Sequence, residues 1–229
     1  MSRIYSNSYF HYTKEFHNLK GILANGFKGS YCKEEFKVDN EIKKLYIPMV
    51  SFCDVPLAHI SQITYGQWGI GMSASWGNEI GLTPVCYFPN NAKAALTTYI
   101  STIAGKLFQE KQNNGLVKCD TILAYAKPRT KYTESKHRAD NYIERESRKA
   151  YTMCSLDSSF HRQQHPSMLL TFSPKDVSFI IVPNEEGRKK LIDAIVDLKT
   201  LGGNNHVLPT EILTLISKII TYEEIKENY

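Results

Sequence analysis

The chain has 229 residues, with 28 Lys and Arg against 23 Asp and Glu, so its formal net charge is +5. Hydrophobic residues make up 42% and charged residues 22%, which is typical of a globular protein and excludes a disordered chain or a coiled coil. No apolar run approaches the roughly 18 residues of a membrane-spanning helix, and the first residues lack the apolar stretch of a signal peptide. We therefore expect a cytoplasmic protein without membrane contact, folded as one domain over residues 1–229.

The cysteines and histidines indicate neither disulfides nor a metal site. The five cysteines are Cys32, Cys53, Cys86, Cys119 and Cys154. An odd number of widely spaced cysteines without an export signal favours reduced thiols. The close pair His161 and His165 is followed directly by Pro166, and no neighbouring cysteine completes a zinc-binding set. We expect no metal.

The first quarter of the chain predicts a strand, a helix and a second strand. Residues 9–12 (Tyr-Phe-His-Tyr) are typical of an aromatic strand. Thr13 is the expected N-cap of a helix that ends at Asn25-Gly26. The apolar face of this helix consists of Phe16, Leu19, Ile22 and Leu23. Charged residues 33–44 predict a surface loop, and residues 45–52 predict the second strand.

The rest of the chain alternates between the two kinds of element without a regular pattern. Residues 65–71, with three glycines, predict a loop that runs into an extended piece. Further strands are predicted over residues 84–88, 121–126, 168–172 and 177–182. Further helices are predicted over residues 92–111, 185–198 and 209–220. Because no βαβ repeat appears, we predict an α+β fold and not a doubly wound sheet.

Common catalytic and nucleotide-binding motifs are absent from the sequence. The glycines at 66–71 match neither the dinucleotide fingerprint nor the phosphate-binding loop, which requires Gly-Lys-Ser/Thr. No G-x-S-x-G occurs, and no cysteine lies in a local nucleophile signature. A Rossmann fold, a P-loop enzyme and a conventional hydrolase are thereby disfavoured.

Three short pieces carry residues suited to a binding site. His11 lies on the first strand, Ser51 on the second, and Glu144 and Glu146 near the start of a later strand. Each piece also has a structural interpretation. A histidine on a strand is more often a hydrogen-bonded packing residue, and two glutamates two apart usually share a solvated face. The basic segment from Lys127 to Arg138 fits either a solvated loop or a nucleic-acid contact.

Taken together, these pieces resemble known proteins. The stretches HYTK, LKGILANGF, YIPMVSFCDVPL and YGQWGIGMS resemble the AbiGi family of abortive-infection proteins. The order of a His strand, a strand with Ser and a late Glu resembles the core of ADP-ribosyltransferase-like folds. The resemblance covers Tyr9 to Val182 and is most specific between Tyr46 and Gly71.

This resemblance implies a role in bacterial phage resistance, with two alternatives. One is an NAD-dependent ADP-ribosyltransferase that modifies a protein or nucleic acid. The other is a catalytically silent antitoxin or sensor that binds a partner toxin or a phage protein, because the AbiGi family is described as the antitoxin partner of a toxin. Fold resemblance alone does not carry activity with it, so both alternatives stay open here.

For the transferase alternative, the resemblance also implies residue roles. Glu146 would stabilise the positive charge that develops on the ribose, and Glu144 would orient the acceptor. The residues implied to bind NAD are His11, Tyr12, Ser51, Tyr65 and Trp68. This role requires Glu146 to be exposed in the same cleft as His11 and free of salt bridges. Ser147 stands where related sequences carry an aromatic residue, which is a departure from the pattern.

Overall fold

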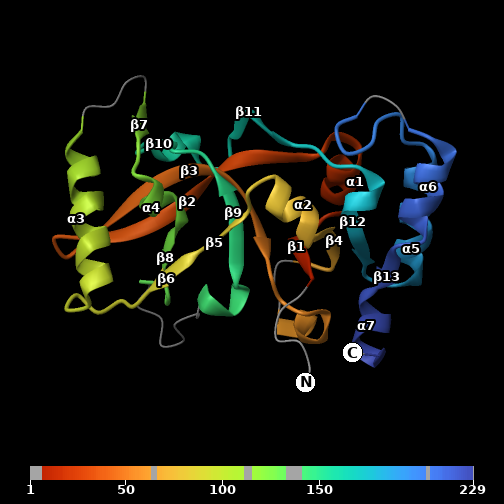
Figure 1. Cartoon of the computed structure of the whole chain (residues 1–229), viewed down its shortest axis with the longest axis horizontal. Coiled ribbons are helices and arrows are strands. Elements are labelled where there is room, and N and C mark those ends of the chain that lie inside the picture. The colour runs from red at the N-terminus through yellow and green to blue at the C-terminus, as the bar shows by residue number, and fades with distance from the viewer. Residues whose placement is uncertain (1–6, 63–65, 111–114, 133–140, 205–206, 229) are drawn as a thin grey trace. The chain divides into compact units, whose positions relative to one another are not determined.

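The computed structural model describes residues 7–62, 66–110, 115–132, 141–204 and 207–228 (Figure 1). Its helices and strands alternate irregularly, so the predicted α+β class is confirmed. The chain divides into two compact units. Unit 1 comprises residues 1–28, 51–82 and 169–229, and unit 2 comprises residues 29–50 and 83–168. Both are built from separate chain segments, and the single domain predicted from the sequence stays a prediction.

Unit 1 contains a mixed sheet flanked by helices. Its strands are β1 (Ser8–Thr13), the end of β3 (Glu41–Cys53), β4 (Trp68–Ser73), β12 (Val177–Val182) and β13 (Ile219–Thr221). Its helices are α1 (Phe16–Asn25), α2 (Ala74–Glu79), α5 (Glu185–Val196), α6 (Pro209–Ile216) and α7 (Tyr222–Asn228). β4 pairs antiparallel with both β1 and β12, whereas β13 pairs parallel with β12. Helices α1 and α5 contact each other and lie against this sheet (Figure 1).

Successive side chains of β1 point to opposite faces of the sheet, and both faces are covered, which suits a strand in the middle of the sheet. Phe10 is 1% exposed and stacks on Phe179 at a centroid distance of 6.3 Å. The next side chain, His11, points to the other face, because successive residues of a strand alternate. There it contacts the rings of Phe27 and Phe52. Both faces of β1 are therefore covered by aromatic side chains.

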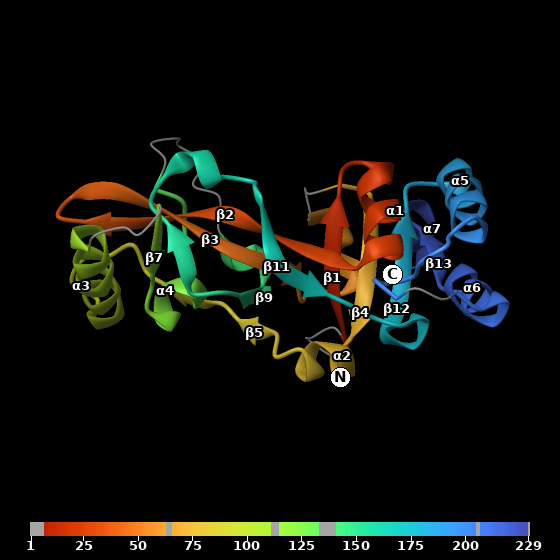
Figure 2. The ribbon, with the colours of Figure 1, turned by 90° about the horizontal axis from the view of Figure 1, so that it is seen from above.

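Unit 2 is organised around a long hairpin. Its strands are β2 (Phe27–Val38, from Gly29), β3 up to Val50, β5 (Thr83–Pro84), β6 (Cys86–Phe88), β7 (Leu116–Lys118), β8 (Ala126–Pro128), β9 (Glu146–Ala150), β10 (Met153–Ser155) and β11 (Gln164–Leu170, up to Met168). Its helices are α3 (Ala95–Gln109) and α4 (Thr121–Tyr125). Figure 2 shows β2 and β3 as a long twisted ribbon, beside which α3 and α4 lie. Apolar side chains of β2, β3, α3 and α4 form one buried cluster.

The hairpin corrects the prediction of a surface loop over residues 33–44. β2 and β3 pair without a break from Ser30↔Met49 to Val38↔Glu41. Asp39 and Asn40 form the turn with φ angles of 49° and 66°, the left-handed pair that suits a two-residue hairpin. The prediction failed because the many charged residues obscure the alternation of buried and exposed side chains along the strand. Phe36 and Val38 are buried, whereas Lys37 between them faces solvent.

Two further predictions differ from the structure. The strand predicted over residues 121–126 is instead helix α4, because Asp120 caps it by accepting a hydrogen bond from the Ile122 N–H at 2.9 Å. The helix predicted over 209–220 ends at Ile216 and is followed by β13 and α7. The helices predicted over 92–111 and 185–198 and the strand over 177–182 are confirmed within a few residues.

The predicted reduced state of the cysteines stays a prediction. All five cysteines are free, and the Sγ atoms of Cys119 and Cys154 lie 2.8 Å apart inside unit 2. Within the described residues, no helix combines the length and the hydropathy needed to cross a bilayer. The same residues hold no group of three or more His, Cys, Asp or Glu suited to a metal ion.

Gly202 provides a test of the packing in unit 1. Its φ is 57°, and an added Cβ would lie 2.1 Å from the Phe172 carbonyl oxygen. We expect Gly202→Ala to lower the free energy of unfolding by about 2 kcal/mol or more, through left-handed strain and this contact with rigid backbone. Gly21→Ala is the matched control, because a Cβ there meets nothing within 4 Å and alanine favours the helix by about 1 kcal/mol. Urea unfolding of both variants measures the contrast, and equal effects would contradict it.

Candidate functional site

The two predicted catalytic glutamates lie in an ionic cluster of unit 2. Glu144 ends a short 3-10 turn, and Glu146 begins β9. The sequence pattern predicts that the two glutamates follow one another along a strand. Arg145 between them has a φ of 43°, however, so they do not. The cluster still joins them, because Lys127 Nζ donates to Glu144 Oε2 at 3.0 Å and to Glu146 Oε2 at 2.8 Å.

Arg148 forms the buried centre of this cluster. Its side chain is 0% exposed. Arg148 Nε donates to Glu146 Oε1 and Arg148 Nη2 lies beside Glu146 Oε2, both at 2.9 Å, which makes the pair bidentate. Nη2 also donates to Glu34 Oε1 at 2.9 Å, and Nη1 donates to the Ala124 carbonyl at 3.0 Å. The guanidinium thus ties β2, α4 and β9 together.

The pKa values in the cluster depend on how its three carboxylates share two cations, Lys127 and Arg148. Burial tends to raise the pKa of Glu146, but the charges of Arg148 and Lys127 outweigh it and lower that pKa to about 2. For Glu34, burial outweighs the single ion pair with Arg148, so its pKa is raised. Burial also raises the pKa of Tyr87, whose hydroxyl accepts a hydrogen bond from the Glu146 N–H, to about 12.

This geometry changes the expectation for Glu146. Its side chain is 8% exposed, and both oxygens accept hydrogen bonds from cationic side chains. The structure therefore does not meet the requirement of the transferase alternative for an exposed carboxylate without salt bridges. The physical reason is that Lys127 and Arg148 supply the charge that compensates its desolvation. The catalytic roles of Glu146 and Glu144 stay predictions. The two salt bridges of Glu146 do not fit the unpaired carboxylate that a transferase would need beside the ribose.

In unit 1, the first and second strands meet as predicted. Phe10 pairs with Cys53 across β1 and β3, and His11 Nδ1 donates to the Ser51 carbonyl at 2.9 Å. The predicted closeness of His11 and Ser51 is confirmed, but Ser51 contributes its backbone and not its hydroxyl to this contact. Burial lowers the pKa of His11 more than this hydrogen bond raises it, which favours the neutral ring.

The other residues predicted to bind NAD pack within unit 1 or lie outside the described part. Tyr12 stacks with Phe10 at 5.9 Å, and burial raises its pKa. The Trp68 ring packs on Phe16 of α1 at 5.2 Å. Tyr65 lies outside the described residues. The described members of this set form aromatic packing contacts, and their binding of NAD stays a prediction.

The basic segment from Lys127 to Arg138 has more than one role. Lys127 is occupied by the two glutamates of the ionic cluster. The Arg129 guanidinium lies over the Tyr142 ring at 5.5 Å. Lys131 lines a cavity, whereas residues 133–140 lie outside the described part. Nucleic-acid binding by this segment stays a prediction.

Sequence reasoning missed a small exposed patch next to the cluster, the Tyr142 patch, which is formed by Tyr87, Arg129, Tyr142 and Ile143. Tyr142 is 52% and Ile143 50% exposed. The Tyr142 ring meets Tyr87 edge-on at 5.4 Å with an interplanar angle of 79°. Tyrosine and arginine side chains held in fixed positions are typical of protein-binding surfaces.

Comparison with known proteins identifies the chain. A family model described as "Putative abortive phage resistance protein AbiGi, antitoxin" matches residues 25–183, which include all of unit 2. The chain is also 26% identical to the abortive phage resistance protein AbiGi of Lactococcus lactis subsp. cremoris, over 84% of this chain and 93% of that protein. The chain thus belongs to a family of abortive phage resistance proteins. That family is AbiGi.

No solved structure matches the chain. The ADP-ribosyltransferase-like fold implied by the sequence resemblance therefore stays a prediction.

Proposed function

We propose that this protein is the antitoxin of an abortive-infection pair and that it acts by binding a partner toxin without catalysis. The observation that carries this proposal is the state of Glu146, whose two carboxylate oxygens are held by Lys127 and Arg148. The charge of a carboxylate held in this way is already compensated by protein groups, and removal of either cation would leave it buried with less compensation. The description of the AbiGi family as antitoxin supports the same conclusion.

The Tyr142 patch is the proposed toxin-binding surface. The family match spans the whole of unit 2 and leaves out the last three helices of unit 1, which supports a shared feature in or near unit 2. Within that unit, Tyr142 and Ile143 are adjacent exposed side chains, and Tyr87 and Arg129 hold the Tyr142 ring in place. A ring fixed before binding loses little conformational entropy when a partner covers it.

We expect Tyr142→Ala to weaken toxin binding about thirtyfold or more, because truncation of a central aromatic contact typically costs about 2 kcal/mol or more. The measurement is the affinity of the purified protein for the partner toxin, together with growth rescue on coexpression. Tyr99→Ala is the control, since Tyr99 is a comparably exposed tyrosine of the same unit, on α3. Equal toxin binding by the Tyr142 and Tyr99 variants would contradict the proposed surface.

NAD turnover distinguishes this proposal from the transferase alternative. We expect the purified wild-type protein not to release nicotinamide from NAD. Release of nicotinamide that Glu146→Gln abolishes in folded protein would overturn the noncatalytic proposal.

A further inference from the structure

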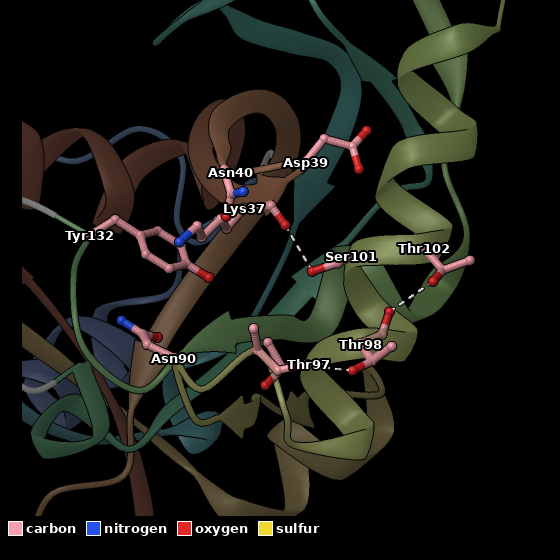
Figure 3. Close-up of a pocket in the computed structure, with 10 residues that line it drawn as sticks. Lys37, Asp39, Asn40, Asn90, Thr97, Thr98, Ser101, Thr102 and Tyr132 are labelled. Atoms are coloured by element: carbon pink, nitrogen blue, oxygen red, sulfur yellow. Dashed lines mark hydrogen bonds between the residues drawn. The ribbon is translucent and has the colours of Figure 1, made fainter.

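A polar cavity of unit 2 lies outside the proposed toxin-binding surface. It has a volume of about 280 Å³ and opens between the first turns of α3 and the β2–β3 turn (Figure 3). An adjoining cavity of about 260 Å³ shares four of its lining residues, Lys37, Asn40, Asn90 and Tyr132. The two cavities therefore lie side by side and share part of their wall, and we treat them as one site.

The wall formed by α3 presents hydrogen-bond acceptors. Its four hydroxyls each lie close to a backbone carbonyl: Thr97 to Pro89 at 2.5 Å, Thr98 to Ala92 at 3.0 Å, Ser101 to Lys37 at 2.8 Å and Thr102 to Thr98 at 2.9 Å. Because a carbonyl oxygen only accepts, each hydroxyl proton must be donated to it. The hydroxyl oxygens keep lone pairs, which a donor in the cavity can use.

Asn90 adds an acceptor that the protein leaves without a partner. Its Nδ2 donates to the Thr130 carbonyl at 2.7 Å and to the Thr130 hydroxyl at 2.9 Å, which fixes the orientation of the amide. Among the described residues, its Oδ1 is buried and has no hydrogen-bond partner. A buried acceptor without a partner is costly, so a ligand that donates to it gains affinity.

The opposite wall carries positive charge and a ring. Lys37 and Lys131 are exposed, and within the described residues no ion pair is formed by either ammonium. Tyr132 lies between the two cavities as a flat, half-buried ring. Figure 3 shows Tyr132 and Asn90 across the opening from Thr97, Thr98 and Ser101. Asp39 at the rim is the one carboxylate among the described lining residues.

We infer that this site binds a sugar phosphate, such as the ribose phosphate of a nucleotide. Sugar hydroxyls would donate to Asn90 Oδ1 and to the α3 hydroxyl oxygens, while Lys37 and Lys131 would bind the phosphate. The Tyr132 ring offers a face for a base. The cavity volume, near the lower end of the range for ligand pockets, suits one nucleotide. Such a site would bind its ligand whether or not the protein is an antitoxin.

Titration calorimetry with AMP, ribose 5-phosphate and inorganic phosphate tests this inference on the full chain. We expect AMP and ribose 5-phosphate to bind at least tenfold more tightly than inorganic phosphate, because only they also reach the acceptor wall. Lys37→Ala should weaken both sugar phosphates about tenfold, since it removes a charged hydrogen bond. Lys118→Ala, which changes an exposed lysine of β7 outside the cavity, should bind like the wild type.

A second variant separates the sugar from the phosphate. Thr98→Val keeps the shape of an exposed helical residue but removes an acceptor, so it should weaken the binding of ribose 5-phosphate and leave the binding of inorganic phosphate unchanged.

An oligoadenylate RNA separates two sources of the ligand. If it binds at least tenfold more tightly than AMP, the ligand is an RNA strand, and if both bind equally, the ligand is a free nucleotide. Equal binding of inorganic phosphate and AMP, no binding of any sugar phosphate at millimolar concentration, or unchanged binding by Lys37→Ala would overturn the inference.

Discussion

Arg148→Met is expected to lower the free energy of unfolding by about 3–5 kcal/mol, a large part of the 5–15 kcal/mol that typical domains possess. The variant keeps the volume of the side chain but removes its charge and its hydrogen bonds. Glu34 and Glu146 would then remain in a buried region with only Lys127 to compensate them. The cost arises from these desolvated carboxylates more than from the loss of any single contact.

Urea unfolding followed by circular dichroism measures this loss, and amide exchange in α4 and β9 locates it in unit 2. Arg162→Met is the matched control, because Arg162 is an exposed arginine of the same unit and its change should stay within about 0.5 kcal/mol. Arg148→Lys should also destabilise, since a single ammonium cannot replace a bidentate guanidinium. A full recovery of stability by Arg148→Lys would show that charge alone matters and would contradict the role given to the fork geometry.

Much of the local structure could be predicted from the sequence because local patterns determine it. The apolar spacing of α1, with Leu19 and Leu23 buried, indicates a helix without any knowledge of its partners. The aromatic strand around His11 and the apolar strand around Ser51 are likewise evident, and their pairing follows from their shared need for burial. Charged residues obscure such patterns, as in the β2–β3 hairpin, where the buried Phe36 and Val38 flank an exposed lysine.

The ionic cluster could not be predicted, because it depends on contacts between distant parts of the chain. Glu34 and Arg148 are 114 residues apart, and no local pattern relates them. Glu146 and Arg148 are two apart on one strand, so their shared face was a signal that could have indicated pairing. The catalytic role implied for Glu146 by the family resemblance took no account of Arg148, two residues away on the same strand face. Residue type alone does not distinguish a catalytic carboxylate from a compensated structural one.

Glu146→Gln and Glu34→Gln form a pair of variants with contrasting expected results. Both keep the side-chain shape and both contact Arg148. Glu146 interacts with two cations, which lower its pKa to about 2, so its ionised form stabilises the folded state. Against an ordinary value of about 4.3, this difference corresponds to about 3 kcal/mol at pH 7. Glu34→Gln should cost much less, because burial raises the pKa of Glu34 and already disfavours its charge.

The pH dependence has opposite signs at the two positions. A lowered pKa in the folded state means that the contribution of Glu146 is present above about pH 4.3 and is lost as the pH falls towards 2. A raised pKa means that the folded state binds the Glu34 proton more tightly, so stability is lost as the pH rises through the folded-state pKa. The stability difference between wild type and Glu146→Gln should therefore shrink below about pH 4.3. For Glu34→Gln, stability relative to the wild type should improve as the pH rises towards neutrality.

Urea unfolding of the wild type and both variants between about pH 3 and pH 7 measures these differences, and the same proteins test the proposed function.

If Glu146 is structural, Glu146→Gln should neutralise the toxin in proportion to its folded fraction, so that full activity returns at low temperature, where that fraction is high. A catalytic Glu146 would instead leave the variant inactive even when it is fully folded, since charge stabilisation at a reacting sugar is lost with the carboxylate. Equal stability of Glu146→Gln and the wild type at pH 7 would contradict the cluster as the source of the effect. The antitoxin proposal therefore predicts that loss of activity at this position is restored by refolding conditions and not by added NAD.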